Sequence, residues 1–235
     1  MRKVIMKKLT GLNTGLLLVG LLVVALAACS TSTAEIPATV GAPAVMEDIT
    51  IVDEDNNTSV DPAALDHAFS GIATTDLSEA EAEGLSFMRE EEKLARDVYL
   101  MLYEQWGIRI FQNIAKAEET HTSAVAGLLE RYGLPDPAVD TAVGVFINPE
   151  LQALYDQLME EGSQSLADAL RVGALVEEVD IIDLEDYIEQ TDNEDLLLVY
   201  QNLLKGSYNH LRAFTSTLEK QTGEIYQLQL LEADA

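Results

Sequence analysis

Two histidines and several carboxylates occur at helical spacing among apolar residues in the second half of the chain. Glu118 and His121 are three residues apart, a spacing that places both side chains on one face of a helix. His210 lies in a later apolar stripe of the same kind. Carboxylates and imidazoles together suit Fe, Mn or Zn, so these residue types point to a metal site.

Four long segments with an apolar period near 3.6 residues would position these side chains. They predict helices over residues 78–106, 110–132, 165–190 and 191–221, and a shorter helix over 149–161. Ser78 followed by Glu81 is a capping box, and Gly107, Gly133 and Gly223 are typical helix ends. No convincing alternating strand follows residue 76. The sequence therefore predicts an all-α domain over 77–223, a four-helix bundle with an extra short helix between its second and third long helices, followed by a C-terminal tail over 224–235.

Each long helix carries at least one ionisable residue within or beside its apolar stripe. In chain order these are Glu91 and Glu92, Glu118 and His121, Glu177 and Asp180, and His210. Burying a charge is costly unless a partner, a proton or a metal neutralises it. Arg89, Lys93 and Arg96 are placed on or toward outer faces, so salt bridges explain these positions poorly. Proton sharing is an alternative, but a divalent metal neutralises such a cluster more completely.

The order of these residues resembles the ferritin-like superfamily, which includes the rubrerythrins. The stretches Phe87–Tyr99 and Gly206–Phe214 are similar to an uncharacterised ferritin-like family of exported proteins, over about residues 77–221. The resemblance implies a ferritin-like bundle that holds Fe, as a di-iron pair, or Mn, with Zn less favoured. It implies as ligands Glu92, Glu118, His121, Glu177 and His210.

The sequence departs from this family's pattern on the last long helix. Ser207 stands three residues before His210, where ferritin-like enzymes carry a Glu. Asp180, one turn after Glu177, could supply the missing carboxylate. The departure leaves both a mononuclear and an asymmetric two-metal site open, and the choice of Glu92 over Glu91 rests on the rubrerythrin-like spacing to Ala95 and Tyr99.

The N-terminal segment predicts export. Basic residues precede an uncharged apolar run that ends at the only cysteine, Cys29, and Leu26–Cys29 resembles a bacterial lipobox. We expect residues 1–28 to be a lipoprotein signal peptide, Cys29 to be lipidated, and residues 29–76 to form a flexible acidic tether. The protein would then lie outside the cytoplasm, on the cell membrane or the outer membrane. The alternatives are an unmodified signal peptide and a transmembrane anchor.

Charge and cysteine content exclude several classes of function. The 235-residue chain has 41 acidic and 14 basic side chains and a formal net charge of −27. Such a charge repels phosphate backbones and disfavours nucleic-acid binding. A single cysteine excludes structural disulfides and rubredoxin-type iron sites. The expected partners are a metal ion, the lipid membrane through acylated Cys29 and an external electron donor; a homodimer stays open.

Two hypotheses follow from the sequence. The first is an exported metal protein that handles iron, oxygen or peroxide, which leaves open whether it is an oxidase or peroxidase type of oxidoreductase. The second is a metal-free helical bundle that has kept the fold and acts as a surface interaction or structural lipoprotein, with Ser207 as the trace of the lost ligand.

Overall fold

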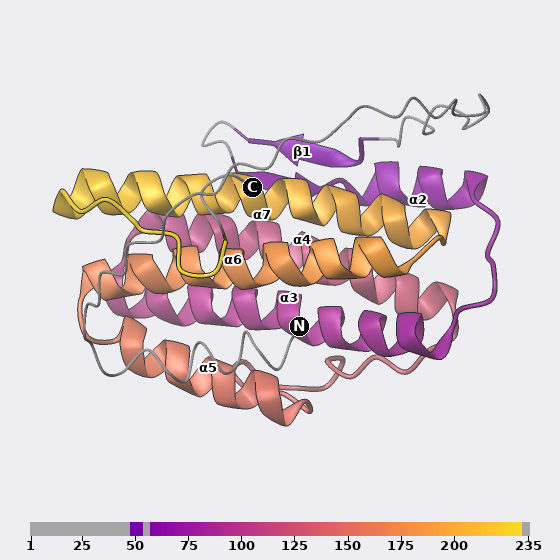
Figure 1. The fold of residues 1–235 in the computed structure, drawn as a ribbon, viewed down its shortest axis with the longest axis horizontal. Coiled ribbons are helices and arrows are strands. Elements are labelled where there is room, and N and C mark those ends of the chain that lie inside the picture. Colours follow the sequence, from indigo (N-terminus) through magenta and orange to yellow (C-terminus); the bar gives the residue numbers. More distant parts are fainter. Residues whose placement is uncertain (1–47, 54–56, 232–235) are drawn as a thin grey trace, which may run out of the picture. The chain divides into compact units, whose positions relative to one another are not determined.

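The computed structural model describes residues 48–53 and 57–231, which are mostly helical (Figure 1). Six helices and one two-stranded sheet form within these ranges. Their bounds are β1 Thr50–Val52, β2 Thr58–Val60, α2 Pro62–Gly71, α3 Glu79–Trp106, α4 Arg109–Arg131, α5 Pro149–Gly162, α6 Leu166–Gln190 and α7 Glu194–Thr222. The prediction of a mainly helical chain is confirmed, and the five helices expected after residue 77 form close to their expected ends.

Local signals in the sequence account for these helix ends. The side chain of Ser78 accepts a hydrogen bond from the backbone N–H of Glu81, and the carboxylate of Glu81 accepts one from the N–H of Ser78. Gly107 ends α3 and Gly223 ends α7 with φ of 66° and 78°, a left-handed conformation that glycine adopts without strain. One start differs: Asn193, not Thr191 or Asp192, is the residue before α7.

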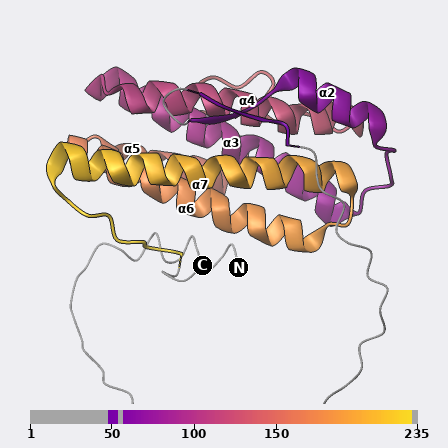
Figure 2. The same ribbon diagram turned by 90° about the horizontal axis from the view of Figure 1, so that it is seen from above.

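The four long helices run alongside one another (Figures 1 and 2). Helix α3 packs against α4 and α6, and α7 packs against α6 and α4. The short α5 packs against α3 and α6. Each long helix buries one apolar stripe, with fully buried members that include Leu85, Val98, Ile114, Leu128, Leu170, Ile181, Leu203 and Phe214. The space enclosed by the four long helices is therefore the core of the protein.

The prediction of a flexible tether over residues 29–76 is wrong for residues 48–53 and 57–71, which the structure describes. Strands β1 and β2 pair antiparallel, with Thr50 opposite Val60, and α2 follows. Strand β2 lies against α4 and α7 (Figure 2). Ile49 and Val60 are buried, and the N–H of Val60 donates to the hydroxyl of Thr120 at 2.8 Å. Strands of three residues are too short to show a period, and contacts with the helices stabilise them.

The predicted C-terminal tail also has packing contacts. After α7, the backbone N–H groups of Gln229, Leu230 and Leu231 donate to the carboxylate of Glu178 on α6 at 2.8–3.0 Å. The hydroxyl of Tyr226 donates to the same carboxylate at 2.6 Å. Glu178 is therefore buried beneath this segment.

No helix within the described ranges is both long enough and apolar enough to cross a membrane. The expected signal peptide, residues 1–28, and the expected lipidation residue, Cys29, lie outside these ranges. Their assignment stays a prediction.

Candidate metal centre

The ionisable residues predicted to face inward come together in the middle of the four long helices. Glu92 lies on α3, Glu118 and His121 on α4, Glu177 and Asp180 on α6, and His210 on α7. None of the six is more than 4% exposed to solvent. The structure thus encloses four carboxyl groups and two imidazoles in the apolar core.

Glu118 occupies the centre of this cluster. Its Oε2 lies 2.9 Å from Nδ1 of His121, and its Oε1 lies 2.7 Å from Nδ1 of His210. Each oxygen of one carboxylate therefore faces one imidazole. Ligand atoms of these three residues lie within 4.8 Å of one another, close enough to hold one metal ion.

Two further carboxylates flank the histidines. Oε2 of Glu92 lies 3.5 Å from Nδ1 of His121, and Oε2 of Glu177 lies 3.7 Å from Nδ1 of His210. Both Nδ1 atoms thus face two carboxylates each, and the two rings stack with centroids 5.4 Å apart. The five residues that the family resemblance implied as ligands lie together around the two imidazole Nδ1 atoms.

Strand β2 orients one histidine through a hydrogen bond. Nε2 of His210 lies 3.0 Å from the backbone carbonyl oxygen of Thr58 in β2. A carbonyl oxygen only accepts hydrogen bonds, so Nε2 carries the proton and Nδ1 is directed at the carboxylates. Such an outer hydrogen bond is the usual way of orienting a metal-binding histidine. Sequence reasoning missed Thr58, because a backbone carbonyl leaves no signal in residue types.

Glu91 and Glu92 point to different neighbours. Glu92 faces His121, whereas Glu91 lies near Asp180 and Asp183 of α6, which raise the pKa of its carboxyl further above what burial alone does. Both side chains are buried. Of the two, Glu92 is the residue that lies beside His121.

Asp180 lies opposite Ser207, the residue of α7 at which the sequence departs from the ferritin-like pattern. The hydroxyl of Ser207 donates to its Oδ2, while its Oδ1 has no hydrogen-bond partner in the described part of the chain. Burial, and then the negative charges of Glu92 and Glu177, raise the pKa of Asp180 well above its usual range. Asp180 is not one of the three residues whose ligand atoms cluster most tightly.

Tyr99 of α3 is a polar neighbour to which the sequence analysis gave no role beyond packing. Its hydroxyl donates to Oε1 of Glu177 at 2.6 Å and is fully buried. In the sequence, the only sign of this contact is a tyrosine among the apolar residues of an inward-facing stripe. This hydrogen bond holds one oxygen of Glu177 and leaves the other directed toward His210.

The charges of the cluster strongly influence one another. Burial would raise the pKa of Glu118, but the imidazoles of His121 and His210 outweigh it and lower that pKa. Burial would lower the pKa of His210, but Glu118 and Glu177 outweigh it and raise that pKa to about 9. Burial raises the pKa of Glu92 to about 7 against the opposing effect of His121. The histidines thus offset the charge of Glu118, while the pKa values of Glu92, Glu177 and Asp180 stay raised.

No lysine or arginine of the described ranges pairs with these six residues. The expectation that Lys93 lies on an exposed face is nevertheless wrong. Lys93 is 2% exposed, because the connection between α4 and α5 covers it and its Nζ pairs with Asp97 at 2.6 Å. Lys93 lies about 100° around α3 from Glu92 and pairs with Asp97, so it does not neutralise the inward carboxylates.

Two imidazoles and several carboxylates form a ligand set that suits Fe, Mn or Zn. The described part of the chain thus contains a mainly helical fold with a buried carboxylate–histidine cluster, which defines the class of protein. Residues 81–234 match the family described as "Uncharacterized protein domain (DUF2202)", and the chain belongs to this family.

The chain is similar to Uncharacterized protein MJ0754 of Methanocaldococcus jannaschii, at 55% identity over 149 residues. The match covers 63% of this chain and 80% of that protein. The crystal structure of hypothetical protein MJ0754 from Methanococcus jannaschii DSM 2661 matches with a TM-score of 0.68 and 52% identity. That match covers 69% of this chain and 93% of the other.

Proposed function

We propose that this protein binds iron or manganese at Glu118, His121 and His210, with Glu92 and Glu177 completing the ligand set. The observation that carries the proposal is the pair of buried imidazole Nδ1 atoms, each directed at two carboxylates with no basic side chain among them. Buried carboxylates without cations are costly, and a divalent metal offsets that cost. Zinc is less favoured, because structural zinc prefers four ligands and this set offers more.

The number of metal ions depends on α7. A symmetric pair would need a second carboxylate from this helix, and Ser207 supplies none. Asp180 supplies a carboxylate from α6, held by Ser207 itself. We therefore propose either one ion at the Glu118 group or an asymmetric pair in which Asp180 takes part.

The proposed activity is the handling of iron, oxygen or peroxide by a ferritin-like four-helix bundle outside the cytoplasm. The bound metal would supply the redox chemistry, while the chain provides a dry, carboxylate-rich enclosure. Reducing equivalents would come from an external donor, since the chain has a single cysteine. Acylated Cys29 would attach the protein to the cell membrane or the outer membrane.

Elemental analysis of the full chain, purified without chelators or a histidine tag, tests this proposal. The full chain is needed because the carbonyl of Thr58 orients His210. We expect one or two iron or manganese ions per chain, and none in the double variant Glu118→Ala, His121→Ala. Glu119→Ala is the matched control, because its carboxylate lies on the same helix but is exposed. Failure to bind metal even after anaerobic Fe(II) loading would overturn the proposal.

A second function, a metal-free bundle that acts as a surface interaction or structural lipoprotein, is favoured by one observation. Glu118 contacts both histidines at hydrogen-bonding distance, so two imidazolium groups could neutralise the cluster without a metal. Under this alternative, the same elemental analysis finds no metal, and added Fe(II) or Mn(II) leaves the melting temperature unchanged.

A further inference from the structure

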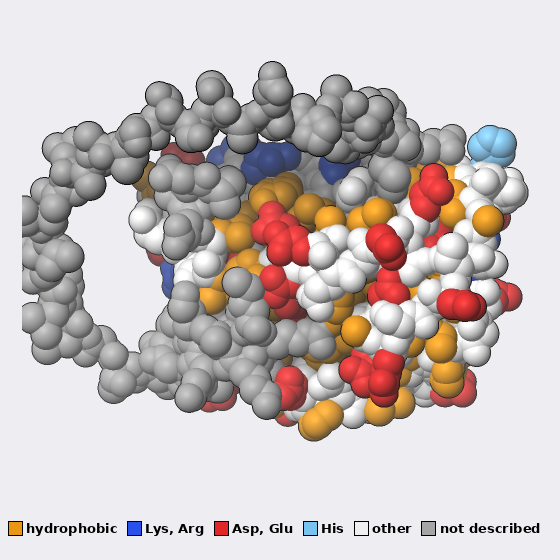
Figure 3. Space-filling view, turned by 45° about the vertical axis from the view of Figure 1, so that its right-hand side comes forward, with side chains coloured by type: hydrophobic (Ala, Val, Ile, Leu, Met, Phe, Trp, Pro, Cys, Tyr) orange, Lys and Arg blue, Asp and Glu red, His pale blue; other side chains and the backbone are white. Residues whose placement is uncertain are grey.

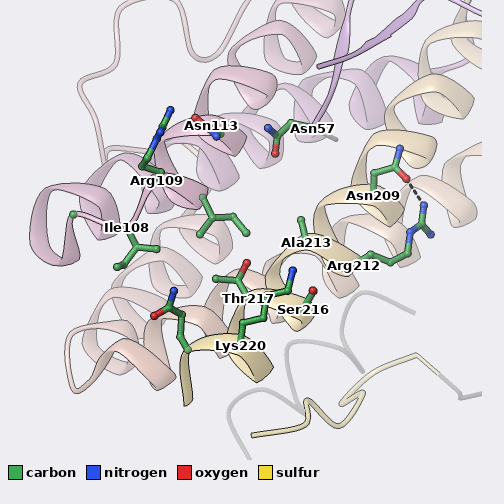
Figure 4. A pocket seen from close by; sticks show the side chains of 13 residues that line it. Asn57, Ile108, Arg109, Asn113, Asn209, Arg212, Ala213, Ser216, Thr217 and Lys220 are labelled. Atoms are coloured by element: carbon green, nitrogen blue, oxygen red, sulfur yellow. Dashed lines mark hydrogen bonds between the residues drawn. The ribbon is translucent and has the colours of Figure 1, made fainter. Parts of the chain in front are cut away.

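A cavity of about 900 Å³ opens between the start of α4 and the second half of α7 (Figure 4). Its walls carry three basic side chains, Arg109 from α4 and Arg212 and Lys220 from α7. The chain has only 14 basic residues in total and a net charge of −27. Acidic side chains are spread over the face in Figure 3, yet no Asp or Glu is among the described residues that line this cavity. A strongly acidic protein thus has a basic pocket.

The basic groups of the pocket are available to a ligand. Within the described ranges, none of the three forms an ion pair with a carboxylate: the arginines and lysines that do so are Arg89, Lys93, Arg96, Arg131, Arg171 and Lys205. Arg212 donates one hydrogen bond, to the side-chain oxygen of Asn209, which holds its guanidinium in place. Basic side chains that line a cavity and have no carboxylate partner attract an anion.

The backbone adds to this positive character. Helix α4 begins at the pocket, and its N-cap residue, Ile108, has no side chain that could accept hydrogen bonds from the first turn. The positive end of the helix dipole therefore lies at the same space. Asn113 on α4 and Ser216 and Thr217 on α7 supply further polar groups.

The spacing of the basic groups indicates the size of the ligand. Arg212 and Lys220 are eight residues apart on α7, so their Cα atoms lie about 12 Å apart along the helix. Arg109 lies on the other wall, at the start of α4 (Figure 4). We propose that this pocket binds a small organic anion with acidic groups at both ends, either phosphate or carboxylate. The volume suits a small molecule, and Ile108, Ile110 and Ala213 would contact its apolar middle.

The pocket adjoins the candidate metal centre but shares none of its residues. Asn57 lines it and precedes Thr58, whose carbonyl contacts His210, and Asn209 precedes His210. Strand β2 lies against both α4 and α7, and Asn57, the residue before it, lines the pocket. The inference goes beyond the proposed metal function and does not depend on it.

Calorimetric titration of the full chain with succinate and with propane-1,3-diol bisphosphate, which carry carboxylates or phosphates at both ends, tests the pocket and separates the two acid chemistries. We expect saturable binding of at least one ion at low ionic strength, and at least tenfold weaker binding in Arg109→Gln, Arg212→Gln. Lys116→Gln is the matched control: it removes one charge from α4 at an exposed residue outside the pocket and should bind as the parent does.

Two results would overturn the proposal. One is the absence of saturable binding of either ion, and the other is an equal loss in Lys116→Gln, which would indicate attraction to surface charge in general. Because Arg109 and Arg212 are exposed, the unfolding curve of the variant Arg109→Gln, Arg212→Gln should match that of the parent. The variant Glu118→Ala, His121→Ala should keep its affinity for the anion, which separates failure of this inference from failure of the metal proposal.

Discussion

Helix α3 buries two groups of charged side chains, and the charges of the two groups are neutralised differently. Toward the α4–α5 connection, Lys93 pairs with Asp97 at 2.6 Å and donates to the carbonyl of Ala142 at 2.9 Å. Arg96 also pairs with Asp97. Toward the core, Glu92 faces His121 and pairs with no lysine or arginine of the described ranges.

The difference separates a structural charge cluster from a candidate functional one. In the Lys93 site the carboxylate of Asp97 pairs with Lys93 and Arg96, and each of its oxygens has a partner in the same chain. The core site has four carboxyl groups and two histidines, with the oxygens of Glu92 and one oxygen of Asp180 lacking hydrogen-bond partners within the described residues. A site that its own chain neutralises needs no ligand, whereas the core site has room for a cation.

The largest expected effect concerns the structural site. Lys93→Met leaves the carboxylate of Asp97 buried with Arg96 as its remaining charged partner, and we expect a loss of about 3 kcal/mol in the free energy of unfolding. Denaturant unfolding measures it. The double variant Lys93→Met, Asp97→Leu should recover much of this loss, because it removes both charges. A loss below about 1 kcal/mol would show that the pair contributes little.

The core site should instead respond to metal. At a free metal concentration 100 times the dissociation constant, Fe(II) or Mn(II) should stabilise the fold by about 2.7 kcal/mol. Thermal unfolding with and without metal under anaerobic conditions measures this gain. Glu118→Ala should abolish it, whereas Lys93→Met should lower both curves equally and keep the gain. A gain that survives Glu118→Ala would place the metal elsewhere.

Gly206 offers a test that leaves every proposed ligand in place. A Cβ at this position would lie 2.5 Å from Cε1 of His121, so Gly206→Ala must displace that ring. We expect a tenfold to hundredfold loss of metal affinity, as for other changes around a metal ligand. Gly127→Ala is the matched control, because its Cβ would meet Phe69 at an ordinary 3.7 Å. Unchanged affinity in Gly206→Ala would indicate that His121 does not bind the metal.

The smallest expected effect concerns the cap of α3, distant from both charge clusters. Burial opposes ionisation of Glu81, but hydrogen bonds from Thr191, Ser78 and Asn193 outweigh it and lower its pKa to about 2. Because the folded pKa lies below the ordinary value of 4.5, the ionised carboxylate stabilises the fold above pH 4.5, and that contribution is lost as the pH falls toward 2.

Glu81→Gln should therefore cost about 1 kcal/mol at pH 7. The difference between the variant and the parent should shrink as the pH falls from 4.5 to 2, as measured by denaturant unfolding over that range. Glu83→Gln is the control, since Glu83 is exposed on the same helix. A difference that stays constant across this range would contradict the assigned pKa.

The periodic apolar residues and their punctuation allowed the helices to be predicted from the sequence. Ser78, Gly107 and Gly223 act through local hydrogen bonds and backbone conformation, so their effects do not require knowledge of the fold. The same period placed Glu118, His121 and His210 on inward faces. Their convergence was predictable because four apolar stripes of this kind have few ways to be buried together.

Only the tertiary structure decided how the remaining charges are neutralised. Lys93 lies outside the apolar stripe of α3, and the α4–α5 connection that covers it has no periodic pattern. Thr58 contacts His210 through a backbone carbonyl, and the basic pocket depends on Arg109 and Arg212, about a hundred residues apart in sequence. The spacing of apolar residues predicts which face of a helix is buried. Contacts between segments distant in sequence depend on how the helices pack, and no local sequence pattern predicts that.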